Sequence, residues 1–304
     1  MKLDKNFVFI IGCPRSGTTY LLKTLAANRN FAWVSSQMDK SPDKIDLIKN
    51  QNIFDKFYSG KRNYRKQEYS YVKPVEPWGF WNYHFEYFQW NKKFSNTPIN
   101  ALPEHNSDRS IKKVRNAVDI IFKETGKNVF LSKYTDFPRV QLIKKAFPNA
   151  KIIHLVRDGR AVANSYNQKI KSGDFNTSKE EENWVSAWPK EWQKEFSDLN
   201  KNPLSFTLYQ WLFFVTQINN ELKSIPSENY IELNYSDLVT NTSGTIQKIL
   251  DFVDVKMDRN LKFFLNHHPG DNKNNKWQNN LSEDEQKIFK KVLEGKGLEK
   301  YLDK

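Results

Sequence analysis

The feature that most constrains the fold is a short polar loop between an apolar run and a helical pattern near the start of the chain. The apolar run, FVFII, covers Phe7 to Ile11 and ends at Gly12. Such an uninterrupted run of β-branched and aromatic residues is typical of a parallel strand that is buried on both faces. The helical pattern that follows, TTYLLKTLAA, covers Thr18 to Ala27. A strand, a glycine-containing turn and a helix in this order predict an α/β fold.

The loop, GCPRSGTT, has the composition of an anion-binding turn. A turn at this place points successive backbone N–H groups and the positive end of a helix at one spot, which suits an oxyanion. The spacing of Gly12 and Gly17 matches a P-loop, but Thr18 stands where an ATP-binding P-loop carries lysine. Arg15 supplies a cation from within the loop. Because a kinase uses that lysine together with Mg²⁺, the loop disfavours a nucleotide or small-molecule kinase, which stays the alternative.

Strands and helices continue to alternate along the rest of the chain. Three more strands are predicted, at 129–131, 151–156 and 230–233. Four more helices are predicted, at 138–147, 158–170, 205–222 and 242–253. A capping box at Ser282 to Glu285 predicts a final helix. No repeat or flexible linker interrupts this order, so we expect one domain over residues 1–304.

A second motif follows the predicted strand 151–156. The segment KIIHLVRDGRAVANSY has Arg157 at the carboxyl end of this strand and Ser165 eight residues later, within a helix. Open α/β sheets bind ligands at the carboxyl ends of their strands. The guanidinium of Arg157 offers paired donors to a phosphate. Together with the first loop, the motif indicates a second phosphate site rather than an ion-pair cluster at a helix start.

The two motifs resemble those of the sulfotransferases that use 3′-phosphoadenosine 5′-phosphosulfate (PAPS). PRSGTT resembles the 5′-phosphosulfate loop of that family, and the segment with Arg157 and Ser165 resembles its 3′-phosphate motif. The likeness covers the first thirty residues and roughly the second half of the chain, and it is closest to the branch of glycan-modifying and bacterial enzymes. It implies a P-loop NTPase-like three-layer fold with a central parallel β-sheet flanked by helices. It also implies PAPS as the sulfuryl donor, with no metal.

The resemblance further implies which residues bind the donor. They come from the two motifs and from two later segments: Arg15, Ser16, Gly17, Thr18, Thr19, Arg157, Ser165, Tyr235, Lys276 and Trp277. Tyr235 is a candidate for stacking on adenine, in a block that the family usually writes YEDL and in which Ser236 here replaces the glutamate. Lys276 and Trp277 open a segment that resembles the one closing over the cofactor.

Catalytic roles are implied for Arg15, Lys133 and Glu76. Sulfuryl transfer needs an activated nucleophile, a neutralised sulfonate and a stabilised leaving oxygen. Lys133, expected just after a short strand, matches the family lysine that contacts the transferring oxygens. Small-molecule members carry a histidine two residues later, where this chain has Thr135. Glycan-modifying relatives use a glutamate in a segment that KPVEPWGFW resembles, so Glu76 is the expected base and His84 the alternative.

Aromatic residues gather between Trp78 and Trp90, with eight in thirteen positions. They predict mainly a hydrophobic subcore over the sheet edge, with some in a wall of the acceptor site. Further tryptophans recur every four residues, at Trp184, Trp188 and Trp192. Because Pro189 interrupts a helix there, we hypothesise that this stripe belongs to a lid on the acceptor side. The expected acceptor is a hydroxyl or amine, on a carbohydrate or glycolipid, with a small metabolite or lipid alcohol as alternatives.

Charge and cysteine content bear on the remaining classes. Lys and Arg total 48 against 35 Asp and Glu, and the net charge of +13 attracts anions such as a nucleotide or a glycan. A non-enzymatic polyanion-binding protein is a second rival, but it leaves both phosphate motifs unexplained, and no nucleic-acid partner is expected. Cys13 is the single cysteine, so neither an intrachain disulfide nor a Cys/His metal site is expected. The first apolar run is too short for a signal peptide or membrane span, which predicts a cytoplasmic protein without a transmembrane anchor.

Overall fold

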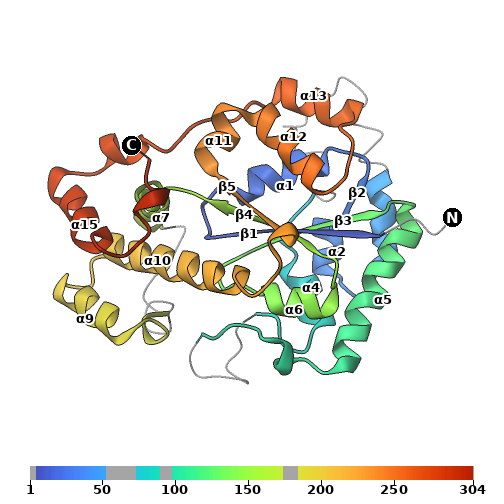
Figure 1. Cartoon of the computed structure of the whole chain (residues 1–304), viewed down its shortest axis with the longest axis horizontal. Coiled ribbons are helices and arrows are strands. Elements are labelled where there is room, and N and C mark those ends of the chain that lie inside the picture. The colour runs from blue at the N-terminus through green and yellow to red at the C-terminus, as the bar shows by residue number, and fades with distance from the viewer. Residues whose placement is uncertain (1–4, 53–72, 90–97, 174–183, 304) are drawn as a thin grey trace.

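The centre of the molecule is a parallel β-sheet, seen in a computed structural model that describes residues 5–52, 73–89, 98–173 and 184–303. Its five strands lie in the order β2-β3-β1-β4-β5, and all neighbouring strands are parallel. The strands are β1 Asn6–Gly12, β2 Phe31–Trp33, β3 Val129–Thr135, β4 Lys151–Val156 and β5 Tyr230–Asn234. Figure 1 shows helices on both sides of this sheet. The predicted α/β fold with three layers is therefore confirmed.

The central strand β1 divides its side chains between the two faces of the sheet. Phe9 and Ile11 pack into the cluster on one face, and Val8 and Ile10 pack into the cluster on the other. All four side chains are at most 1% exposed. This double burial explains why the sequence shows an uninterrupted apolar run there instead of an alternating one.

Helices form the two outer layers (Figure 1). One face is covered by α1 Thr18–Ala26, α12 Thr242–Phe252 and α13 Arg259–His267. The other is covered by α4 Trp78–His84, α5 Asp108–Thr125 and α6 Val140–Ala146. A third cluster of buried residues joins α7 Gly159–Lys171, α10 Pro203–Leu222 and α15 Glu283–Leu293.

Short elements complete the described part of the chain. The short helices are α2 Ser36–Lys40, α9 Lys190–Asp198, α11 Tyr235–Thr240 and α14 Lys276–Asn280. The 3₁₀ turns are η1 Ile45–Lys49, η3 Pro103–His105, η4 Ser227–Asn229 and η5 Glu299–Tyr301. None of the helices in the described ranges combines the length and the hydrophobicity needed to cross a bilayer.

Every strand and helix predicted from the sequence is present. Most boundaries lie within two residues of the prediction, and two of the differences bear on the site. The strand expected to end at residue 131 continues to Thr135, so Lys133 lies within β3 and not after it. The strand continues through polar residues because they are buried between neighbouring elements, which hydropathy alone does not reveal. The helix expected from residue 138 begins at Val140, because Arg139 takes a non-helical backbone conformation as its N-cap. Several further elements were not predicted, among them the short strand β2 and the helices α5 and α13.

The aromatic segment after residue 78 forms the predicted subcore. Its buried members are Phe80, Trp81, Phe85, Tyr87 and Phe88, whereas Tyr83 is 46% exposed and Trp90 lies outside the described residues. The tryptophan stripe is also packed inside the molecule. Trp188 and Trp192 lie against Tyr209 of α10, with ring centroids 5.6 and 6.0 Å away. For these two residues the hypothesis of a lid is wrong, because their indole rings are more favourably buried against α10.

Replacing Phe9 with alanine tests how strongly the central strand depends on its aromatic contacts. Phe9 is fully buried, and its ring lies within 6.5 Å of the rings of Trp81, Phe130, Tyr134 and Phe147. We expect Phe9→Ala to lower the free energy of unfolding by about 3–5 kcal/mol in urea titrations, because the cavity cannot close. The control Ile120→Ala, on an exposed helix face, should change it by about 0.5 kcal/mol or less. Similar losses in both variants would contradict this prediction.

Candidate active site

The loop after β1 has the geometry of an anion cradle. Arg15 (φ 70°) and Gly17 (φ 90°) both adopt left-handed backbone conformations, and α1 begins directly afterwards at Thr18. No side chain caps the helix N-terminus, so its first N–H groups are available to an anion. The hydroxyl of Ser16 is buried and has no hydrogen-bond partner among the described residues. Gly17 is also required sterically, since a Cβ there would lie 2.6 Å from the ring of Tyr235.

Arg157, which directly follows β4, connects the second motif with this loop. Its Nη1 donates to the backbone carbonyl of Arg15 at 3.0 Å, and its Nε donates to Oδ1 of Asn274 at 2.7 Å. Its guanidinium lies over the ring of Tyr235, 4.3 Å from the centroid. These two bonds use two of the five N–H groups of the guanidinium. Among the residues that the structure describes, the other three N–H groups remain available to a ligand.

Arg15 and Ser165 also join the two motifs, although 150 positions separate them in sequence. The Nε of Arg15 donates to the hydroxyl of Ser165 at 3.0 Å. Arg15 itself is exposed and Thr19 is exposed beside it, whereas Thr18 is only 3% exposed. The structure therefore brings the phosphate loop and the second motif to one place at the carboxyl edge of the sheet, as the sequence predicted.

A strongly cationic cleft of about 390 Å³ opens beside these residues. It is lined by Arg15, Arg157, Ala161, Asn164, Ser165, Gln168, Lys169, Ser172, Lys273, Lys276 and Asn280. Five of these residues are Arg or Lys, and none is Asp or Glu. The buried Oδ1 of Asn164 has no partner among the described residues. This volume is in the usual range of ligand sites, and its charge suits a ligand with several negative groups.

The remaining predicted donor-binding residues lie in different surroundings. Tyr235, directly after β5, is 6% exposed and packs between Gly17 and Arg157, while its hydroxyl donates to the carbonyl of Asp271 at 3.0 Å. Lys276 lines the cleft. Trp277 does not line it, because its indole packs into the core against Phe289 and beneath the guanidinium of Arg160. Large apolar area favours this inward position for Trp277.

Glu76 and Lys133 form an ion pair at the carboxyl end of β3. Oε2 of Glu76 accepts a hydrogen bond from Nζ of Lys133. Oε1 accepts from the backbone N–H of Thr135 and from its hydroxyl, the latter at 2.8 Å. The side chain of Lys133 is 5% exposed and that of Glu76 18% exposed. Two of the three residues expected to catalyse the reaction, Glu76 and Lys133, are therefore in contact, beside the strand that precedes the GCPRSGTT loop.

His84, the alternative base, lies in the aromatic subcore. It is 4% exposed, its Nε2 is 3.2 Å from the carbonyl of Pro42, and its ring is 4.5 Å from that of Phe80. Burial lowers the pKa of His84 to about 4. Within the described ranges, the hydrogen bond and ring contacts of His84 involve neither Glu76 nor Lys133, so its surroundings favour a packing role.

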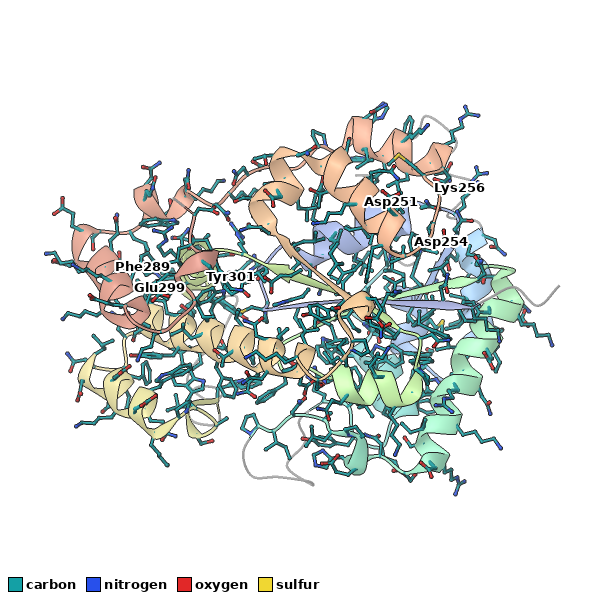
Figure 2. All side chains as sticks on the ribbon, in the orientation of Figure 1. Asp251, Asp254, Lys256, Phe289, Glu299 and Tyr301 are labelled. Carbon is teal, nitrogen blue, oxygen red and sulfur yellow. The ribbon has the colours of Figure 1, made fainter. Side chains whose placement is uncertain are left out.

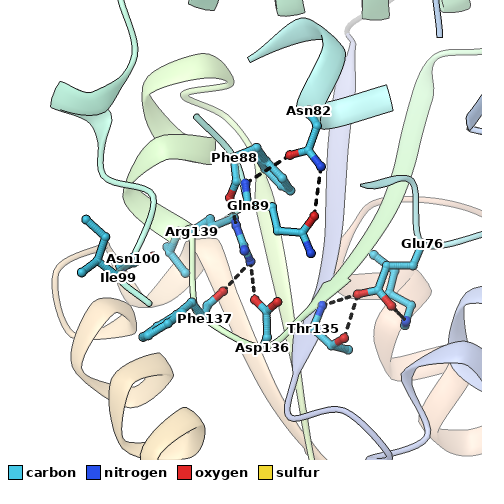
Figure 3. A network of polar contacts seen from close by, with 12 residues as sticks. Glu76, Asn82, Phe88, Gln89, Ile99, Asn100, Thr135, Asp136, Phe137 and Arg139 are labelled. Carbon is cyan, nitrogen blue, oxygen red and sulfur yellow. Dashed lines mark hydrogen bonds and ion pairs between the residues drawn. The ribbon is translucent and has the colours of Figure 1, made fainter. Parts of the chain in front are cut away.

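Asp136 and Arg139 are charged residues of this region that the sequence analysis missed. Asp136 directly follows Thr135, has a left-handed backbone (φ 78°) and accepts from Nη1 of Arg139 at 2.8 Å. Figure 3 shows Glu76 and Asp136 on either side of Thr135. Burial raises the pKa of Asp136 to about 6, the charge of Glu76 adds to this, and Arg139 opposes it. An aspartate at the end of a strand that carries Lys133 was the signal available in the sequence.

No group of three or more His, Cys, Asp and Glu side chains that could hold a metal ion occurs in the described ranges. The fold and the site define the class: an α/β protein with an anion cradle after its central strand and a cationic cleft next to it.

The family follows from comparison with known proteins. The sequence profile described as the Sulfotransferase family matches residues 8–259, so the chain belongs to this family. The resemblance seen in the two phosphate motifs is thereby confirmed, and the kinase alternative is not favoured. A comparison with curated protein sequences finds no match.

Solved sulfotransferases share the fold. Sulfotransferase STF1 from Mycobacterium tuberculosis H37Rv superposes with a TM-score of 0.54 at 12% sequence identity, over 95% of this chain and 76% of that one. Sulfotransferase STF9 from Mycobacterium avium gives a TM-score of 0.51 at 14% identity, over 96% of this chain and 77% of that one. At such low identity these two structures support the fold alone.

The raised pKa of Asp136 predicts a pH dependence of stability. Between its ordinary value of 3.8 and about 6, the folded chain holds a proton that the unfolded chain has released. The contribution of Asp136 to the free energy of unfolding therefore falls as the pH rises from about 4 to about 6. Asp136→Asn removes this component, and an asparagine tolerates the left-handed backbone and can still accept from Arg139. The slope of unfolding free energy against pH between pH 4 and 6, measured in urea, should therefore be more positive in that variant than in the wild type.

The exposed Asp43 provides the matched control for this experiment. Asp43→Asn should leave the slope between pH 4 and 6 as in the wild type. Equal slopes in wild type and Asp136→Asn would contradict the assignment of a raised pKa to Asp136.

Proposed function

We propose that the chain, as one domain over residues 1–304, transfers the sulfuryl group of PAPS to an acceptor hydroxyl or amine. The observation that carries this proposal is the contact between Arg157 and the phosphate loop, which joins two anion-binding motifs beside one cationic cleft. A donor with phosphate on both the 3′ and the 5′ side of its nucleoside needs two such points close together. Membership of the sulfotransferase family supports the same chemistry.

The chain's own residues fit the donor. The N–H groups at the start of α1, the orphaned hydroxyl of Ser16 and the side chains of Thr18 and Thr19 would hold the 5′-phosphosulfate, with Arg15 as the cation. Arg157 and Ser165 would hold the 3′-phosphate, and Lys276 adds charge at the cleft. Tyr235 lies beneath Arg157 and is suited to supporting that side chain, a different role from stacking on adenine. Trp277 is proposed only as the core anchor of its segment.

The catalytic step is assigned to Glu76 and Lys133. PAPS supplies a sulfuryl group on a phosphate leaving group. The acceptor oxygen or nitrogen gives its proton to Glu76 while it bonds to sulfur, and the sulfur–oxygen bond to the phosphate breaks. Lys133 and Arg15 stabilise the negative charge on the transferring and leaving oxygens. The ion pair holds Lys133 and Glu76 at the same edge as the phosphate loop.

We infer that the acceptor is a carbohydrate or glycolipid and that the reaction takes place in the cytoplasm. Thr135 stands where small-molecule members carry histidine, and Glu76 lies in the segment that supplies the base of glycan-modifying relatives. Both features support a glycan acceptor, and so does the net charge of +13. Neutral sugars and acidic glycans tested with ³⁵S-labelled PAPS will distinguish between acceptor classes. Labelling of lipid alcohols alone would contradict the glycan assignment.

Donor binding is the first test. We expect calorimetry to show metal-independent binding of adenosine 3′,5′-bisphosphate with a clear preference over ADP and ATP. Arg157→Ala should weaken bisphosphate binding by about tenfold or more, because charged hydrogen bonds to a 3′-phosphate are lost. Arg29→Ala, an exposed arginine outside the cleft, is the matched control. Preference for ATP with Mg²⁺, or no discrimination, would refute the sulfotransferase proposal in favour of a kinase or a polyanion-binding protein.

Glu76→Gln tests the base. We expect its kcat for the best glycan acceptor to fall by about 10²–10⁴-fold, while the affinity for adenosine 3′,5′-bisphosphate stays within about threefold. Glu86→Gln, a carboxylate that contacts Ser107 on the surface, should retain the wild-type kcat. A glutamine variant with normal kcat would exclude Glu76 as the base.

A further inference from the structure

The segment after η5 returns to the donor cleft from the far end of the chain. Tyr301, labelled in Figure 2, is 5% exposed, and its hydroxyl donates to Oε2 of Glu232 on β5 at 2.9 Å. Two residues later, the backbone N–H of Asp303 donates to Oδ2 of Asp158 at 2.9 Å, and the guanidinium of Arg160 donates to the Asp303 carbonyl. Asp303 is thus attached to the first turn of α7, next to Arg157.

The side chain of Asp303 makes a second set of contacts. Its Oδ2 accepts from the hydroxyl of Ser236 at 2.8 Å and from Nδ2 of Asn274. Oδ1 of the same Asn274 accepts from Nε of Arg157 at 2.7 Å. A carboxylate can only accept and a guanidinium can only donate, so the two neighbours together fix the orientation of the Asn274 amide. Asn274 is 1% exposed, and its Nδ2 also donates to the hydroxyl of Ser236 at 2.7 Å. Because a hydroxyl can either donate or accept, this contact alone does not dictate which way the amide faces.

We propose that Asp303 is a positioning residue of the donor site, which acts through Asn274 on Arg157. Asp303 is not one of the cleft-lining residues, but Asn274 lies between two that are, Lys273 and Lys276. Asp303 therefore holds both the guanidinium of Arg157 and the segment that closes this side of the cleft. The inference rests on the proposed function, in which Arg157 binds the 3′-phosphate.

The sign of the expected effect separates positioning from simple electrostatics. A carboxylate near an anion site repels the anion, so an Asp303 that acted only through its charge would weaken donor binding. Removal of the Asp303 carboxylate would then strengthen binding of the donor. In the positioning role the opposite holds. Without Asp303 the Asn274 amide keeps the Ser236 hydroxyl as a neighbour, but that hydroxyl no longer has an acceptor that directs its proton, so the amide and Arg157 are held less firmly.

The experiment measures the binding of two nucleotides by calorimetry at one ionic strength. Adenosine 3′,5′-bisphosphate reports on the 3′-phosphate site, and adenosine 5′-monophosphate lacks that group. We expect Asp303→Ala to weaken bisphosphate binding by about tenfold or more and to leave monophosphate binding within about threefold of the wild type. The control Glu299→Ala removes a negative charge from an exposed position in η5, just before this segment (Figure 2). This variant should bind both nucleotides as the wild type does.

A double-mutant cycle tests the route through Asn274. If Asp303 acts only through Asn274, Asp303→Ala combined with Asn274→Ala should bind the bisphosphate no more weakly than Asn274→Ala alone. Thermal unfolding of each variant without ligand shows whether it folds. Should Asp303→Ala fail to fold, Asp303→Ser retains the backbone bonds and is measured by the same criteria.

The outcomes are distinct. Bisphosphate binding that is unchanged or tighter in Asp303→Ala, or an equal loss for both nucleotides, would overturn the positioning role. A wild type that does not prefer the bisphosphate over the monophosphate would instead refute the proposed function. A selective loss in Asp303→Ala, absent in Glu299→Ala, supports the role of Asp303.

Discussion

The buried guanidinium of Arg157 is the point on which the donor side of the site depends. A buried cation is costly unless its N–H groups are paired, so the groups around it have to be assembled together. One bond ties it to the phosphate loop through the Arg15 carbonyl, another ties it to the segment after α13 through Asn274, and the ring of Tyr235 supports it from β5. The ends of β1, β4 and β5 thereby meet around a single side chain.

The two sides of the site differ in how their charges are balanced. On the donor side, Arg and Lys side chains line the cleft without a carboxylate among them, which leaves a positive field for an anionic ligand. On the side of β3, opposite charges are paired, Lys133 with Glu76 and Arg139 with Asp136. Such pairing keeps the buried charges tolerable on the side where we propose that a less charged acceptor binds. The division is consistent with in-line transfer, in which donor and acceptor approach sulfur from opposite sides.

Departures from the family pattern have local explanations. Ser236 stands where the YEDL block carries glutamate, and its hydroxyl donates to the carboxylate of Asp303 at 2.8 Å. A glutamate there would bring two carboxylates together, with the Coulomb cost of like charges. Trp277 was expected near the cofactor, but its indole is buried against Phe289, and its neighbour Lys276 reaches the cleft instead. A one-residue shift along a short helix is enough to exchange an inward for an outward position.

The sequence by itself determined the elements whose signals are local. The apolar run of β1, the GCPRSGTT loop and the Arg157 to Ser165 spacing identify the parallel sheet, the phosphate loop and the second anchor, because each depends on neighbouring residues. Only the tertiary structure decided which distant residues complete the site. Asn274, Asp303 and Asp136 carry no periodicity or motif, and their roles come from hydrogen bonds to residues far away in the chain or from burial at a strand end. Such contacts exist only after the sheet has brought its carboxyl ends together.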